Sequence, residues 1–133
     1  MPVTLKLVTP VGVLPPQPAY QVTFTASDGE IGIREGHAPL VALVGHGIVE
    51  TVQKDGARRT WAVRGGVAQV LKDEVNVLVD EALEVTAIDA ARVQARLEAL
   101  QGGAKPERDD EVAWLKGQLA ALARRQARAA AHA

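Results

Sequence analysis

The segment Ile48-Val-Glu-Thr-Val-Gln-Lys-Asp-Gly-Ala-Arg-Arg-Thr-Trp-Ala-Val63 decides the fold of the first part of the chain. Its two ends, Ile48 to Val52 and Thr60 to Val63, are rich in residues that favour strands. Asp55-Gly56 lies between them and favours the tight turn of a β-hairpin. Apolar residues that alternate with polar ones, as in strands with one buried face, predict further strands before and after this hairpin. They are Val3, Leu5 and Leu7; Val22, Phe24 and Ala26; and Val75, Val77 and Val79.

Turn-forming dipeptides separate these runs at short intervals, at Pro15-Pro16, Asp28-Gly29 and Gly65-Gly66. Many short strands with frequent turns predict an antiparallel β-sandwich or barrel. A parallel α/β sheet is disfavoured, because no helical pattern separates the strands. His46 stands between two glycines, and we expect it in an exposed turn.

The chain changes character near residue 86, where Val, Thr, Gly and Pro give way to Ala, Leu, Arg, Glu and Gln. Residues 1–86 carry 7 basic and 10 acidic side chains, whereas residues 87–133 carry 8 basic and 6 acidic ones. This shift in residue type and in the sign of the charge predicts two modules, 1–86 and 87–133.

The second module predicts two helices. Asp89 is suited to cap a helix that starts at Ala90, and Gly102-Gly103 with Pro106 would end it. A second helix would be capped by Asp109 or Asp110. Apolar residues at helical spacing form one stripe on each helix: Val93, Leu97 and Leu100 on the first, and Val112, Leu115, Leu119 and Leu122 on the second.

Two such stripes joined by a short turn predict an antiparallel helical hairpin. The hairpin has few large apolar residues, and Gly117 inside the second helix costs about 1 kcal/mol relative to Ala. We therefore expect the hairpin to need a surface to lie on, and to be a mobile element.

Composition excludes several classes of function. The chain has 133 residues, no cysteine, 3% aromatic residues and a formal net charge of -1. Zero cysteine rules out disulfides and thiolate metal sites, and the low charge and few aromatics disfavour nucleic-acid binding. No apolar run approaches the roughly 20 residues of a membrane-spanning helix. The first residues lack the pattern of a leader segment, so we expect a cytoplasmic protein.

Groups suited to catalysis or metal binding are sparse. His37, His46 and His132 have no partner at metal-ligand spacing. Ser27 is the only serine and lies beside an Asp-Gly turn, which disfavours a serine hydrolase. His37 stands in the loop-like string Gly36-His37-Ala38-Pro39, which favours a structural role for its ring over a catalytic one. We predict no catalytic residue and no metal site.

Four residues of the second module could meet at one end of the hairpin. Arg124 and Arg128 share a helix face, and Asp89 and Arg92 begin the first helix. In an antiparallel hairpin the three arginines and the one carboxylate would be neighbours, which points weakly to a nucleotide. The alternative is that the arginines only complement the helix dipole and aid solubility.

The string Gly29-Glu30-Ile31-Gly32-Ile33-x-x-Gly36-His37-Ala38-Pro39-Leu40, then Gly65-Gly66 and Ile88-Asp89-x-x-Arg92, resembles the epsilon subunit of bacterial F-type ATP synthases. The resemblance covers the whole chain. It implies a flattened sandwich of about ten strands, residues 1–86, followed by an α-helical hairpin, residues 87–133. It also implies a non-catalytic rotor subunit of the central stalk, bound to the gamma subunit and the c-ring at the cytoplasmic face of the bacterial inner membrane.

The resemblance also assigns roles to single residues. Glu30, Ile31, Gly32 and His37 would contact the c-ring. Ile88, Asp89, Arg92, Arg124 and Arg128 match positions of the family's ATP site, although Val93 replaces the usual alanine and Ala99 a basic residue of some binders. The expected site is weak and regulatory, and no cofactor is required. When extended, the hairpin would reach the alpha and beta subunits and inhibit ATP hydrolysis.

Two other interpretations stay open. One is a ligand-binding β-sandwich module with a helical oligomerisation tail, and the other is a small hydrolase that uses His37 and a nearby carboxylate. The first predicts a stable homo-oligomer without affinity for gamma, and the second predicts an activity that depends on His37.

Overall fold

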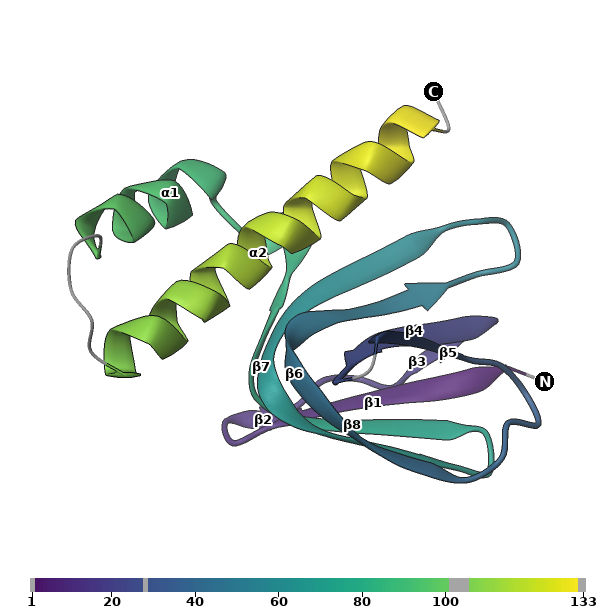
Figure 1. The fold of residues 1–133 in the computed structure, drawn as a ribbon. Helices are drawn as coiled ribbons and strands as arrows, with labels where there is room; N and C mark the ends of the chain where they lie inside the picture. The colour runs from purple at the N-terminus through teal and green to yellow at the C-terminus, as the bar shows by residue number, and fades with distance from the viewer. Residues whose placement is uncertain (1, 28, 101–105, 132–133) are drawn as a thin grey trace.

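A computed structural model describes residues 2–27, 29–100 and 106–131, without the side chains of 106–108 and 126–131. An all-β part comes first and a helical part follows (Figure 1). The strands are β1 (Val3–Thr9), β2 (Gly12–Val13), β3 (Gln17–Ala19), β4 (Gln21–Ala26), β5 (Gly29–Ile33), β6 (Leu40–Val52), β7 (Arg58–Leu71) and β8 (Glu74–Glu84). The helices are the short 3-10 turn η1 (Val85–Ala87), α1 (Ala90–Ala99) and α2 (Pro106–Ala131).

The strands form one continuous sheet that folds over on itself into a sandwich (Figure 1). Its order is β2-β1-β8-β7-β6-β4-β5, with β3 paired to β1. The hairpin predicted around Asp55-Gly56 is present, since β6 and β7 pair up to Val52 and Arg58. One pairing departs from the predicted antiparallel arrangement: β1 runs parallel to β8. Strands so far apart in the sequence can pair in either direction, because no tight turn joins them.

The described residues contain eight strands, where about ten were expected. The difference arises because β6, β7 and β8 are 13, 14 and 11 residues long and run through both layers of the sandwich. Each bends at the corner between the layers, where the β6–β7 pairing breaks between Val44↔Gly66 and Gly47↔Val63. The sheet thus turns a corner inside three strands without ending them.

Gly65 and Gly66 lie at this corner, inside β7, so the predicted turn at this dipeptide is wrong. Gly65 has a φ of 38°, in the left-handed region that disfavours residues with a side chain. A Cβ at Gly66 would overlap the carbonyl oxygen of Leu78 on β8. These glycines therefore serve to bend a strand and to let a neighbouring strand approach closely.

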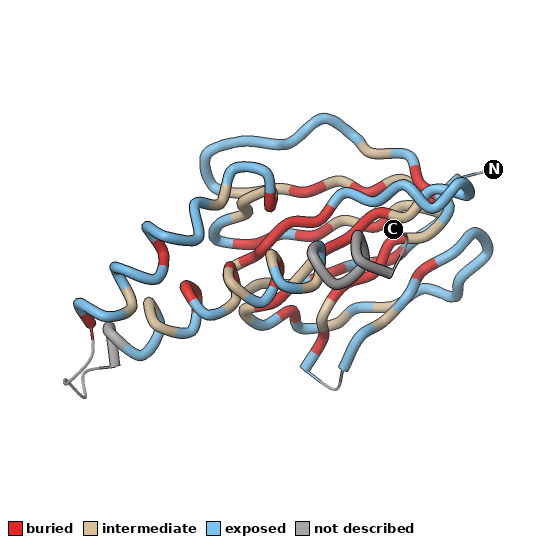
Figure 2. Tube along the Cα trace, turned by 90° about the horizontal axis from the view of Figure 1, so that it is seen from above, coloured by how far each residue is buried: buried red, intermediate tan, exposed pale blue. Residues whose placement is uncertain are grey.

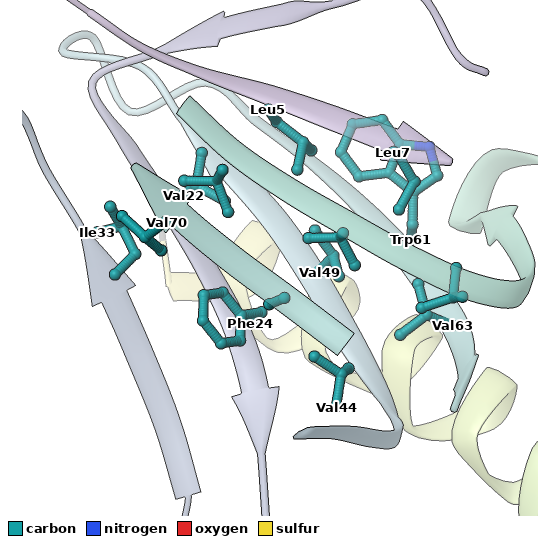
Figure 3. Close-up of a cluster of buried hydrophobic side chains, with 14 of the residues drawn as sticks. Leu5, Leu7, Val22, Phe24, Ile33, Val44, Val49, Trp61, Val63 and Val70 are labelled. Carbon is teal, nitrogen blue, oxygen red and sulfur yellow. The ribbon is translucent and has the colours of Figure 1, made fainter. Parts of the chain in front are cut away.

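The main core fills the sandwich between the two layers (Figures 2 and 3). Phe24 and Ile33 come from one end of the sheet and Leu5 from the other, and all three are fully buried. The predicted alternation is confirmed for the strands around Leu5, Phe24 and Val77, whose apolar residues face this core. The sandwich is therefore a folded unit with its own apolar interior.

The first helix begins as the sequence predicts. Asp89 is the N-cap of α1, and its carboxylate accepts a hydrogen bond from the backbone N–H of Arg92 at 3.2 Å. Val93 and Leu100 are buried against Leu115 of α2. Gly102-Gly103, predicted to end this helix, lie outside the described residues, as do Asp28 and His132.

The second helix begins earlier than predicted. α2 starts at Pro106, so neither Asp109 nor Asp110 is its N-cap. Proline is well suited to the first turn of a helix, where its missing N–H leaves no bond unmade. Asp110 is thereby free to bond to the sandwich.

Two faces of α2 make two separate apolar clusters. Of the predicted stripe, Val112, Leu115 and Leu119 pack against α1, whereas Leu122 packs on the second face. A second face carries Trp114 and Ala121, which pack with Ala62 of β7 and Val85 of η1; we call these four residues the docking cluster. The docking cluster is distinct from the sandwich core, so the helical pair lies on the sandwich without sharing its interior.

Candidate functional site

A fully buried carboxylate, Glu50 of β6, lies where α2 meets the sandwich. Arg58 donates to its Oε1 at 2.8 Å, and the hydroxyl of Thr60 donates to its Oε2 at 2.8 Å. Both partners come from β7, the strand paired with β6. Burying a charge is costly unless it is paired and hydrogen-bonded, and β7 supplies both kinds of partner.

Arg124 of α2 completes this group from the helical side. Its guanidinium lies 3.3 Å from Oε1 of Glu50 and 2.7 Å from Oε1 of Glu30 on β5. Burial of Arg124 would by itself lower its pKa, but the hydrogen bond and charge of Glu50, followed by those of Glu30, outweigh it and raise the pKa. The arginine therefore stays charged and ties α2 to two strands of the sandwich.

A second ionic contact ties the beginning of α2 to the sandwich. The carboxylate of Asp110 accepts a hydrogen bond from Arg64 of β7 and another from Nε2 of His46 on β6, the latter at 2.7 Å. Arg64 also pairs with Glu81 of β8 at 3.3 Å. The hydrogen bonds from Arg64 and then His46 lower the pKa of Asp110, so this carboxylate is ionised at neutral pH.

The expectation that His46 lies in an exposed turn is therefore wrong. It lies inside β6, with its side chain 22% exposed, beneath the first turns of α2. The flanking glycines suggested a turn, but they belong to the bend of a long strand. No local signal could reveal that a helix from the other module covers this histidine.

The predicted c-ring residues follow one edge of the sheet. Glu30, Ile31 and Gly32 lie on β5, the terminal strand in the sheet order, and Ile31 packs against the sandwich core. His37 lies in the loop after β5, where its Nδ1 donates to the carbonyl of Ala38 at 2.7 Å. This contact fits the structural role expected of the ring. Three of the four residues thus lie on one edge strand, and the fourth lies in the loop that follows it.

The predicted ATP residues are spread along the helical part. Ile88 packs beside both helix clusters, and Asp89 and Arg92 are exposed at the beginning of α1. α1 packs on the first half of α2, and α2 continues past the beginning of α1 (Figure 1). Arg124 accordingly faces Glu50 and Glu30. The side chain of Arg128 lies outside the described residues.

An exposed apolar row crosses the outer face of three strands. Leu43 of β6 pairs in register with Val67 of β7, which pairs with Leu78 of β8. These three residues, which we call the apolar row, are 67%, 37% and 49% exposed. Contiguous apolar surface of this kind is typical of a protein interface.

The described part of the chain contains no group of three His, Asp or Glu residues placed to hold a metal ion. Among the same residues, no helix is long and apolar enough to cross a membrane. An exposed apolar row of this kind is typical of proteins that contact other chains.

Comparison with known proteins identifies the family. The family model described as "ATP synthase, Delta/Epsilon chain, beta-sandwich domain" matches residues 2–85. The ATP synthase epsilon chain of Synechococcus sp. (strain JA-2-3B'a(2-13)) is 37% identical over 98 residues, 74% of this chain and 71% of the relative. That of Solibacter usitatus is 40% identical over 103 residues, 76% of each chain. The chain belongs to the delta/epsilon family of ATP synthase subunits.

Solved structures show the same fold. A chain in the cryo-EM structure of the Euglena gracilis mitochondrial ATP synthase, OSCP/F1/c-ring, superposes with a TM-score of 0.78 at 23% identity, covering 91% of this chain and 81% of that chain. A chain of the Tetrahymena thermophila central stalk and c-ring gives a TM-score of 0.60 at 12% identity, covering 92% and 97%. The predicted β-sandwich followed by two helices is therefore confirmed.

Proposed function

We propose that this chain is a rotor subunit in the central stalk of an ATP synthase, without catalytic activity of its own. It would help to couple ion translocation through the c-ring to ATP synthesis. The observation that carries this proposal is the division of the molecule into a sandwich with its own core and a helical pair docked through a separate cluster. Family membership supports this interpretation over the ligand-binding module and the hydrolase.

The surfaces of the sandwich suit two partners. The apolar row offers exposed Leu43, Val67 and Leu78 to the gamma subunit. Glu30, Ile31, Gly32 and His37, along the β5 edge, would contact the c-ring. The chain would then lie at the cytoplasmic face of the bacterial inner membrane as a peripheral protein, attached only through the complex.

The helical pair would be the regulatory part. Among the described residues, this part docks through the docking cluster and the ion pairs of Asp110 and Arg124. A switch needs two conformations that differ by only a few kcal/mol, and an interface of this size can supply such a difference. Released from the sandwich, α2 would extend toward the alpha and beta subunits and block ATP hydrolysis.

Removal of residues 88–133 tests both parts of the proposal. We expect the truncated chain to copurify with gamma, because the apolar row and the β5 edge remain, and the assembled complex to hydrolyse ATP several-fold faster. ATPase assays with and without an ion gradient measure the second effect. Unchanged hydrolysis under every ion-gradient condition would refute the inhibitory role of the helices but not the rotor role. A second test concerns the rotor role: we expect the double substitution Leu43→Asp/Leu78→Asp to abolish binding to gamma. Retained binding in this variant would contradict the apolar row as the gamma surface, and failure of the original chain to copurify with gamma would contradict the rotor role.

We further propose that Ile88, Asp89, Arg92, Arg124 and Arg128 form a weak regulatory ATP site. ATP would compete with Glu50 and Glu30 for Arg124, which accounts for a low affinity. We expect saturable heat in ATP calorimetry that Arg92→Ala abolishes. Arg125→Ala, which removes an exposed arginine next to Arg124, is the control and should bind as the original chain does. No heat at millimolar ATP would rule the site out.

A further inference from the structure

A cleft of about 650 Å³ opens beside the turn that joins β6 and β7. Its walls come from the segment before β4, the loop after β5 and the β6–β7 turn. The four predicted c-ring residues, the predicted ATP residues and the apolar row do not line it. Arg34 and Glu35, which do, lie between Gly32 and His37, so the cleft borders the predicted c-ring surface. The volume lies within the range of about 300–1,000 Å³ that is usual for small-molecule sites.

Two cations gather on one aromatic ring in this cleft. The guanidinium of Arg34 lies 4.9 Å from the centre of the Tyr20 ring, and the ammonium of Lys54 lies 5.8 Å from it. Cations are attracted to the face of an aromatic ring at such distances. Both side chains also line the cleft, so two positive charges border the same space.

Hydrogen bonds hold the walls of the cleft in place. Nε of Arg34 donates to the side-chain oxygen of Gln21 at 2.8 Å, which orients the guanidinium and leaves its other N–H donors available. The amide of Gln53 donates to the carbonyl of Pro18 at 2.8 Å, and the backbone N–H of Tyr20 donates to Val52 at 3.0 Å. The site is therefore formed before a ligand arrives.

The two cations have no partner of opposite charge among the described residues. In contrast, Arg58, Arg59 and Arg64 each pair with a carboxylate of the sandwich. Glu35 also lines the cleft, so a ligand meets one acidic and two basic side chains there. Two cations against one carboxylate leave an excess of positive charge beside a proline and tyrosine wall.

We propose that this cleft binds a phosphoryl group through Arg34 and Lys54. The planar guanidinium matches phosphate oxygens in pairs, and the lysine adds a point charge. Pro2, Pro18 and Tyr20 would hold the apolar part of a phosphate ester. The phosphoryl group can come from a soluble phosphate or from the headgroup of an anionic lipid, and both sources share this chemistry.

Chemical-shift titration of the isolated full chain with inorganic phosphate, at constant ionic strength, tests the site. We expect saturable shifts at the amides of Tyr20 and Lys54, and at least tenfold weaker binding in Arg34→Gln/Lys54→Gln. Lys54→Gln alone, which removes no hydrogen bond among the described residues, should weaken binding without disturbing the fold. The control Lys116→Gln/Arg125→Gln removes the same two charges from exposed positions on α2 and should leave binding unchanged.

Vesicle flotation separates the two sources of the phosphoryl group. Binding to phosphatidylglycerol vesicles but not to phosphatidylcholine vesicles, lost in the cleft variant alone, would assign the site to a lipid headgroup. Phosphate binding without vesicle binding would assign it to a soluble phosphate. Shifts that do not saturate, or that weaken equally in the cleft and α2 variants, would overturn the proposal.

Discussion

Glu50→Ala is expected to destabilise the protein by about 3 kcal/mol, which would lower the melting temperature by roughly 10 °C. The substitution leaves Arg58 and Arg124 without the carboxylate that both contact. Removal of one partner of a buried pair costs roughly 3–5 kcal/mol. The lower end applies here, because Arg58 and Arg124 are 28% and 20% exposed and can still reach water. Chemical denaturation monitored by circular dichroism measures the change in unfolding free energy.

A matched control is available on the same arginine. Glu30 also pairs with Arg124, but its side chain is 48% exposed. Exposed ion pairs contribute about 0–1 kcal/mol, so Glu30→Ala should hardly change the stability. Glu50→Gln keeps the shape and an acceptor for Thr60, and its effect should fall between the two. If Glu50→Ala and Glu30→Ala had equal effects, the buried group would not have the structural role argued for it.

The elements that could be predicted from the sequence depend on neighbouring residues. Asp55-Gly56 sets a hairpin through turn geometry, and Asp89 caps α1 through a bond to an N–H three residues away. Gly65-Gly66 carries the same local signal as a turn, yet it lies at a strand corner because β8 must approach it. Glycine permits both uses, and only the neighbouring strand decides between them.

The contacts between modules could not be predicted for a related reason. Glu50 looks like an ordinary strand residue and His46 like a turn residue, and their partners Arg124 and Asp110 lie 74 and 64 positions away. Trp114 was absent from the predicted stripe, because the polar Gln118 interrupts the apolar pattern of the docking face between Trp114 and Ala121. Leu122 is the one residue of the predicted stripe that packs on this face. The other three residues of the stripe, Val112, Leu115 and Leu119, pack on α1. The more regular pattern therefore predicted the helix–helix contact and not the docking contact.

Trp114→Ala is expected to release the helical pair from the sandwich. Trp114 is the largest side chain of the docking cluster and is 7% exposed. Truncation of a buried tryptophan costs roughly 3–5 kcal/mol. The substitution therefore destabilises the contact between the helices and the sandwich, because the core of the sandwich does not contain Trp114. We expect α1 and α2 to lose helical signal at a lower temperature, while the fluorescence of Trp61, which lies in the sandwich core, reports melting close to that of the original chain.

Leu119→Ala is the control, since Leu119 is partly buried between α2 and α1 and makes no part of the docking cluster. It should weaken the helix–helix contact and leave α2 on the sandwich. Loss of the helices and the sandwich in a single transition in Trp114→Ala would contradict separate docking.

The same variant joins the structure to the proposed regulation. A loss of about 3 kcal/mol from the docked state shifts the balance between docked and released helices by roughly 100-fold toward release. If the released pair blocks ATP hydrolysis, a complex assembled with Trp114→Ala should hydrolyse ATP more slowly than one with the original chain, the opposite of the effect of deleting residues 88–133. Truncation removes the inhibitory helices, whereas the substitution keeps them and weakens only their contact with the sandwich. Equal hydrolysis rates in the two complexes would show that docking does not restrain the helices.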